Sequence, residues 1–130
     1  MKDLLEKNRV QTQAILELAT EALEDMKARD VRVMDVGQLT SITDYMIIAS
    51  GTSDRHVRSI ASRLVDRAKE AGYPALGVEG SDGGEWVLVD LQDVVVHIMQ
   101  PRVRDFYKLE KLWDMGDSAA DPDSKAGAGA

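Results

Sequence analysis

The residues at positions 51–53 (Gly-Thr-Ser) are the first candidates for chemistry, because they join an apolar run to an apolar helical period. A strand, a tight turn and a helix start direct backbone N–H groups toward one point, where a phosphate could bind. The stretch lacks the further glycines and the lysine of the P-loop and dinucleotide-binding patterns. Ser53 and Asp54 are also good N-cap residues. We therefore favour a capped helix start over a phosphate site.

Acidic pairs are the second candidates, because clustered carboxylates could hold magnesium for a nucleotidyl transfer reaction. The pairs are Asp90 with Asp93 and Asp35 with Asp44. Asp90 and Asp93 straddle a turn, so their side chains need not converge. We interpret these aspartates as surface turn residues and expect no metal site and no catalytic residue.

The two histidines lie far apart, and neither has a serine or carboxylate at a spacing that would make it a catalytic base. His97 stands in a strand of valines and isoleucine and is expected to be partly buried with its hydrogen bonds satisfied. His56 stands at a helix start and is expected to face solvent.

Trp86 is a candidate for binding and not for catalysis. Strand alternation places it on one face with Leu88 and Asp90, and places Val87 and Val89 on the other. An exposed tryptophan beside a leucine is typical of an interface anchor. The alternative is a tryptophan that packs in the core under a helix, and the sequence leaves the two open.

Apolar periodicity predicts the elements that position these residues. We expect the first nine residues to fray, and a helix to follow from about residue 10 to residue 29. The remaining elements are strands and helices bounded by Gly, Pro, Ser and Asp: strands at 31–35 and 44–50, a helix from residue 54 to Gly72, a strand at 75–78, a hairpin of 85–90 with 94–99, and a last helix at about 104–113. The predicted fold is α/β, with a mixed five-stranded sheet, flanking helices and the order α-β-β-α-β-β-β-α.

Length and composition fit one domain in residues 1–116, followed by a tail at 117–130. That tail has no large apolar side chain, so we expect it to be disordered. The chain has no cysteine, which excludes disulfides, thiolate catalysis and cysteine-ligated zinc. It shows neither a signal peptide nor an apolar stretch of membrane-spanning length, so we expect a cytoplasmic protein. We also expect no cofactor, because no cofactor-binding pattern is present.

The net charge of −7 narrows the choice of partner. Affinity for nucleic acid comes largely from Lys and Arg that displace counterions, so we expect no sequence-specific nucleic acid as a direct partner. Opposite potentials raise encounter rates, and an acidic body therefore suits a basic protein.

A series of segments between residues 16 and 113 resembles the ribosomal silencing factor (Iojap-like) family. The segments follow one another in that family's order and spacing, at residues 44–48, 51–53, 79–80, 84–90, 94–97 and 107–113. Two positions depart from the pattern: Met46 stands where the family usually has phenylalanine, and Gln92 where it often has glycine.

The resemblance implies a nucleotidyltransferase-like fold without the catalytic carboxylates. It also implies a translational repressor that binds the large ribosomal subunit through ribosomal protein number fourteen and blocks joining of the small subunit, and that forms a homodimer when free. A metal-dependent nucleotidyl transferase is the alternative function. For docking on the partner, we expect a centre at Trp86, Leu88 and Asp90, with Tyr45 and Glu79 as neighbours. If Trp86 belongs to the core, the last helix is the alternative docking face.

Overall fold

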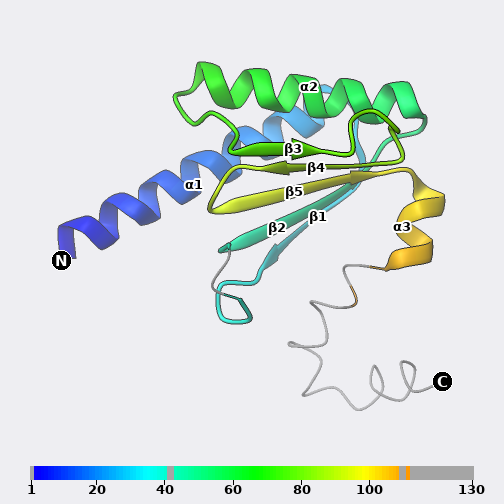
Figure 1. Cartoon of the computed structure of the whole chain (residues 1–130). Helices are drawn as coiled ribbons and strands as arrows, with labels where there is room; N and C mark the ends of the chain where they lie inside the picture. Colours follow the sequence, from blue (N-terminus) through cyan, green and yellow to red (C-terminus); the bar gives the residue numbers. More distant parts are fainter. Residues whose placement is uncertain (1, 41–42, 109–110, 112–130) are drawn as a thin grey trace, which may run out of the picture.

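The fold is a five-stranded sheet with two long helices on one face and a short helix at one end (Figure 1). The structure is a computed structural model that describes residues 2–40, 43–108 and 111. The elements in chain order are α1 (Lys2–Asp25), β1 (Arg29–Asp35), β2 (Tyr45–Ser50), α2 (Asp54–Glu70), β3 (Gly77–Glu79), β4 (Trp86–Asp90), β5 (Val94–Met99) and α3 (Pro101–Tyr107). This order confirms the sequence prediction. The expected tail at 117–130 and Trp113 lie outside the described residues.

The sheet is mixed, as predicted, with the strand order β1-β2-β5-β4-β3. The central pair, β2 and β5, is parallel, with Tyr45 opposite Val94 and Ser50 opposite Met99. Its connection passes through α2, β3 and β4, since parallel neighbours need a long crossover. All other strand pairs are antiparallel.

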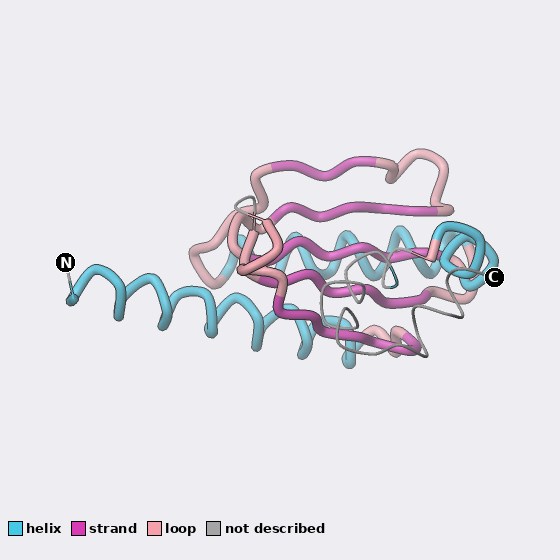
Figure 2. The backbone as a smooth tube through the Cα atoms, turned by 90° about the horizontal axis from the view of Figure 1, so that it is seen from below, coloured by secondary structure: helices cyan, strands magenta, loops and turns pink. Residues whose placement is uncertain are grey.

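The two faces of the sheet are covered differently. Side chains from α1 and α2 form the main core on one face with alternate residues of β2, β4 and β5. Seen from below, the strands lie in front of α2, so neither long helix covers the other face (Figure 2). A smaller cluster lies on that open face and consists of Met34, Val36, Met46, Ile48, Met99 and Val103, with Trp86 packed against it.

Helix α1 begins earlier than the sequence predicted. It extends from Lys2 to Asp25, so the expectation that the first nine residues fray is wrong. Lys, Glu and Leu make up most of residues 2–7 and have high helix propensity, so a helix over these residues is favoured locally. The helix ends before Lys27, whose φ of 58° is left-handed, and residue 29 already belongs to β1. Among the described residues, no helix is both long and apolar enough to cross a membrane.

The last helix also differs from the prediction. We expected residues 104–113, but α3 begins at Pro101 and ends at Tyr107. Proline fits the first helical position because its missing N–H has no partner there and its φ is already helical. Lys108 ends the helix in the left-handed conformation, with φ 50° and ψ 49°.

Candidate functional site

Strand β4 carries the candidate docking residues, and its two faces alternate as predicted. Val87 and Val89 are fully buried in the main core, whereas Trp86, Leu88 and Asp90 are half-buried on the open face. The open face of β4 is therefore accessible to a partner over part of each of these three side chains.

Trp86 belongs to both the surface and the core. Its ring packs against the smaller cluster on the open face. Its indole N–H donates a hydrogen bond to Nδ1 of His97 at 3.0 Å. The ring centroid of Tyr107 in α3 lies 5.0 Å from that of Trp86, with the planes tilted by 49°. The polar end of the indole is thus fixed in the interior, while part of the ring stays exposed, which is how amphipathic aromatic residues anchor interfaces.

His97 holds that indole as a neutral base. It is buried in β5, with an exposed fraction of 6%. Desolvation by burial lowers the pKa of His97 from 6.5 to about 4. Its Nδ1 accepts a hydrogen bond from the Trp86 N–H, so the one N–H of the neutral imidazole is at Nε2. The expectation that His97 is at least partly buried is confirmed, and its Nδ1 is hydrogen-bonded.

A small hollow of about 200 Å³ lies beside Trp86, and its walls are Glu79, Gly80, Trp86 and Leu88. The register brings Glu79 next to Leu88 across β3 and β4. Gly80 makes the close approach possible, since a Cβ there would lie 2.1 Å from the Trp86 carbonyl oxygen. Its φ of 86° also favours glycine. We call this hollow, together with Asp90, the β4 docking face.

Tyr45 lies apart from the β4 docking face. It shares its side of β2 with Ile47 and Ala49 and packs against the main core. A separate hollow places Tyr45 beside Asn8 and Thr12 of α1. The structure therefore brings together Trp86, Leu88, Asp90 and Glu79 but places Tyr45 on the other face of the sheet.

Three of the four candidate aspartates accept hydrogen bonds within turns or from α1. Oδ1 of Asp90 accepts a hydrogen bond from the Gln92 N–H at 2.8 Å, and Oδ2 of Asp93 accepts one from Thr12 Oγ1 at 2.9 Å. Oδ1 of Asp35 accepts from the Gly37 N–H at 3.2 Å. Within the described ranges, no group of three or more His, Cys, Asp or Glu side chains is placed to hold a metal ion.

The turn before α2 is a capped helix start. Ser53 is the N-cap, and its hydroxyl oxygen accepts a hydrogen bond from the His56 N–H at 3.1 Å. His56 Nδ1 accepts from the Thr52 N–H at 2.9 Å, so two N–H groups of this turn are already bonded.

The sequence predicted that His56 faces solvent, but the structure shows this side chain bonded to the end of α1. It is half-buried. Its Nε2 lies 2.7 Å from the Met26 carbonyl oxygen at the end of α1, and with Nδ1 accepting, Nε2 donates there. The contact joins two helices that are distant in sequence, which periodicity could not reveal.

The sequence offered the last helix only as an alternative docking face, whereas the structure packs α3 against Trp86 of β4. Phe106 and Tyr107 are exposed, at 77% and 54%, and their rings meet edge to face with centroids 5.0 Å apart. Together with Trp86 they form an aromatic row. Pro101 was the signal in the sequence for where this helix begins, because proline at the first helical position lets α3 start directly after β5.

Comparisons with known proteins agree on one family. A family model described as ribosomal silencing factor during starvation matches residues 9–128. The chain is 49% identical over 104 residues to a ribosomal silencing factor of Chromobacterium violaceum, covering 80% of this chain and 85% of that one. It is 44% identical over 100 residues to that of Haemophilus influenzae, covering 77% and 98%. A crystal structure of a Chromobacterium violaceum protein superposes with a TM-score of 0.77 at 50% identity, covering 78% of this chain and 84% of that one.

Proposed function

Because this chain belongs to the ribosomal silencing factor family, we propose that it represses translation by binding the large ribosomal subunit through ribosomal protein number fourteen. In this proposal the bound protein blocks joining of the small subunit by its bulk. The observation that carries the proposal is the β4 docking face, with half-exposed Trp86 and Leu88 beside the hollow that Glu79 and Gly80 complete.

The chemistry of the β4 docking face fits a basic protein. Trp86 and Leu88 supply an apolar centre from which water can be excluded, and Glu79 and Asp90 add carboxylates at its edge. An apolar centre with a polar rim is the usual anatomy of a protein interface, and charge at the rim mainly orients the approach. The net charge of −7 acts in the same direction.

The proposed mechanism is steric and needs no catalytic group or cofactor. Three of the four aspartates that could have served a nucleotidyl transferase, Asp35, Asp90 and Asp93, instead accept hydrogen bonds within turns or from α1. We therefore propose that the protein has no nucleotidyl transferase activity. Incubation with labelled nucleoside triphosphates and magnesium should give no transfer above a heat-denatured control, and activity that Asp90→Ala or Asp44→Ala removes would contradict this.

We further propose that the protein acts in the cytoplasm and forms a homodimer when it is free. Both proposals rest on family membership. Sedimentation equilibrium over a range of protein concentrations tests the second, and a mass that stays monomeric at all concentrations would contradict it.

The main test is co-sedimentation with purified ribosomal subunits. The protein should sediment with large subunits and not with small ones, and its addition should reduce the yield of joined ribosomes. Isolated ribosomal protein number fourteen should compete for the binding. Binding to small subunits alone, or binding that leaves joining unchanged, would overturn the proposed function.

A further inference from the structure

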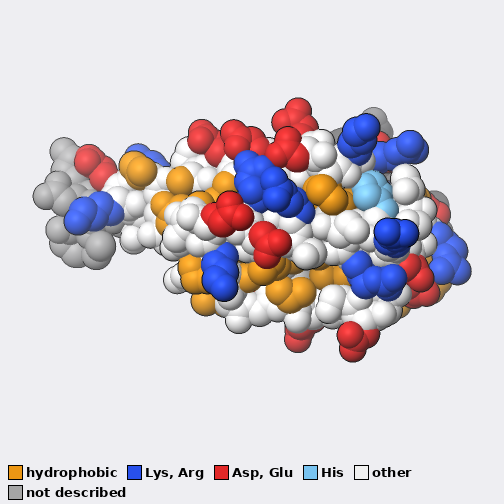
Figure 3. Space-filling view, turned by 90° about the horizontal axis from the view of Figure 1, so that it is seen from above, with side chains coloured by type: hydrophobic (Ala, Val, Ile, Leu, Met, Phe, Trp, Pro, Cys, Tyr) orange, Lys and Arg blue, Asp and Glu red, His pale blue; other side chains and the backbone are white. Residues whose placement is uncertain are grey.

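Charge is unevenly distributed along the strands of the sheet. The β1–β2 and β4–β5 register places four carboxylates at one end, those of Asp35, Asp44, Asp90 and Asp93. The opposite end, where α2 begins and α3 lies, carries Arg29, Arg55, Arg58, Arg102 and Arg104. Figure 3, which views the helix side, shows Lys and Arg side chains gathered at the right-hand end of the molecule. An acidic protein thus has one end rich in cations.

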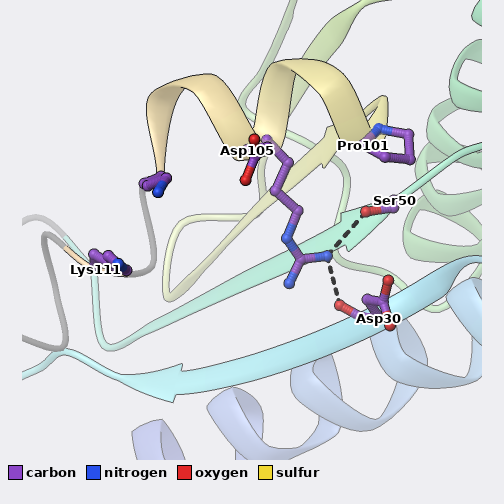
Figure 4. A pocket seen from close by; sticks show the side chains of 7 residues that line it. Asp30, Ser50, Pro101, Asp105 and Lys111 are labelled. Atoms are coloured by element: carbon purple, nitrogen blue, oxygen red, sulfur yellow. Dashed lines mark hydrogen bonds between the residues drawn. The ribbon is translucent and has the colours of Figure 1, made fainter.

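A cavity of about 290 Å³ opens at this basic end, between α3 and the ends of β1 and β2. Three of its lining side chains are cationic, those of Arg104, Lys108 and Lys111, and two are carboxylates, those of Asp30 and Asp105. The charge of the lining is therefore positive, in contrast to that of the whole chain. Figure 4 shows Ser50 and Asp30 on neighbouring strands beside α3, and its dashed lines mark the hydrogen bonds that both accept from Arg104.

Arg104 is held firmly in this position. Its Nη1 donates to the Asp30 carbonyl oxygen at 2.6 Å and to Ser50 Oγ at 3.0 Å. Ser50 is itself buried, with an exposed fraction of 2%. A guanidinium anchored by a backbone oxygen and a buried hydroxyl forms a fixed positive wall, and preorganised cations bind anions with a smaller loss of conformational entropy.

The two lysines complete the cavity from its rim. Lys108 occupies a left-handed position that glycine normally fills, and its N–H donates to the Arg104 carbonyl oxygen at 2.8 Å. Lys111 follows one turn later, and its N–H donates to the Lys108 carbonyl oxygen at 3.0 Å. Lys108 and Lys111 are both exposed, and within the described part of the chain neither lies in an ion pair with a carboxylate.

We propose that the α3 cavity, defined by Arg104, Lys108 and Lys111, binds a phosphodiester group of RNA on the large ribosomal subunit. The proposal rests on the proposed function, which brings the protein to a particle built of RNA and protein. Lysine and arginine bind backbone phosphates without reading sequence. The β4 docking face would then contact protein, and the basic end would contact RNA.

Continuity between the two surfaces supports RNA of the same particle as the occupant. Tyr107 of α3 contacts Trp86 of the β4 docking face, and Arg104 lies one helical turn before Tyr107. A partner that covers Trp86 therefore approaches α3 as well. Asp30 and Asp105 keep the excess of positive charge small, so the cavity adds to docking and does not bind RNA strongly by itself.

The test compares two double variants with the same change in charge. Lys108→Gln with Lys111→Gln removes two cations from the α3 cavity. Arg63→Gln with Lys69→Gln removes two exposed cations from α2, on the other face of the sheet. Affinity for purified large subunits is measured for both between 50 and 300 mM KCl, roughly the range over which counterion release is evident.

The cavity variant should bind large subunits about tenfold more weakly at low salt, and the slope of log affinity against log salt should fall by about 1 to 2. The α2 variant should keep the affinity and slope of the wild type. Both should bind isolated ribosomal protein number fourteen as the wild type does. Equal slopes for the two variants, or weaker binding of the cavity variant to the isolated protein, would overturn the RNA assignment. If the wild type itself fails to bind large subunits, the proposed function fails first.

A second measurement identifies the occupant directly. The chain has no cysteine, so Asp105→Cys provides a single attachment point for an iron–EDTA reagent at the cavity. Hydroxyl radicals released there should cut ribosomal RNA in the bound complex, whereas the same reagent on Lys69→Cys should leave that region uncut. Absence of cuts from the Asp105 position in a complex that still forms would overturn the proposal.

Discussion

The indole N–H of Trp86 is hydrogen-bonded to Nδ1 of His97 at 3.0 Å, and this bond joins the surface of β4 to the buried part of β5. The ring centroids of the two residues lie 5.8 Å apart. The residue directly opposite His97 in the register is Leu88, and Trp86 lies opposite Met99. Trp86 therefore reaches His97 diagonally across the strand pair. Docking and stability are therefore coupled at Trp86, and a test of docking must separate the two.

Leu88→Ala separates them, because Leu88 is half-buried at the hollow and makes no side-chain hydrogen bond. It should weaken binding to large subunits by about 1 to 2 kcal/mol, roughly five- to thirtyfold, with a small change in melting temperature. Binding is measured by co-sedimentation and melting by circular dichroism. Unchanged binding would show that the β4 docking face is not the contact.

Trp86→Ala should affect both properties. It should weaken large-subunit binding by about 2 kcal/mol or more, since central interface tryptophans carry much of the binding energy. It should also lower the free energy of unfolding by roughly 2 kcal/mol, because it leaves His97 Nδ1 without a donor and removes the Tyr107 contact. Trp86→Phe is the control, since it retains an aromatic ring beside Tyr107. If Trp86→Ala binds as tightly as the wild type, the β4 docking face is not used.

Charge reversal on the β4 docking face should act mainly at low salt. Glu79→Lys should weaken binding to a basic partner most at about 50 mM salt, and the effect should fade toward about 300 mM as the Debye length shortens. Glu79 is exposed and pairs with Leu88 in the register, so its replacement leaves the fold unstrained. Asp90→Lys should act in the same direction but also loosen the turn at Gln92. Tighter binding of Glu79→Lys would indicate an acidic partner surface.

The buried His97 should make stability depend on pH. Its folded pKa of about 4 lies below the ordinary 6.5, so the unfolded chain binds the proton more tightly. The stabilisation is complete above pH 6.5 and is lost as the pH falls from 6.5 toward 4. Between pH 7 and pH 5 the free energy of unfolding should drop by about 2 kcal/mol. Urea unfolding at each pH measures this drop. His97→Gln, whose amide oxygen can still accept a hydrogen bond from the Trp86 N–H, should lack it.

The left-handed turn between β4 and β5 offers a stabilising substitution. Gln92 has a φ of 76°, and its N–H donates to Oδ1 of Asp90. A residue with a Cβ loses about 1 to 2 kcal/mol of stability in this left-handed conformation. Glycine avoids that cost, but its greater flexibility in the unfolded chain cancels about half of the gain. Gln92→Gly should therefore raise the free energy of unfolding by up to about 1 kcal/mol. Gln92→Ala keeps a Cβ and should show no such gain in urea unfolding.

The sequence alone determined the order of the elements and the two faces of β4. Period-two alternation distinguishes Val87 and Val89 from Trp86 and Leu88 because side chains of a strand point to opposite faces. The burial of β4 follows that pattern residue by residue. Ser53 was identified as an N-cap because the capping bond is local to the chain. The family was also evident from short segments, since their order and spacing are properties of the sequence.

Only the tertiary structure decided the environment of each candidate residue. Tyr45 and Trp86 were expected to be neighbours. Because side chains alternate along β2, Tyr45 lies on the face with Ile47 and Ala49, which packs against α1. Whether Trp86 is exposed or buried depended on His97 and on α3, which fold against it from other parts of the chain. The cavity that gathers Arg104, Lys108 and Asp30 likewise joins residues far apart in sequence. Local patterns fix which face a side chain takes, but contacts between distant segments fix what it meets there, because they depend on how the strands pair and where the helices pack.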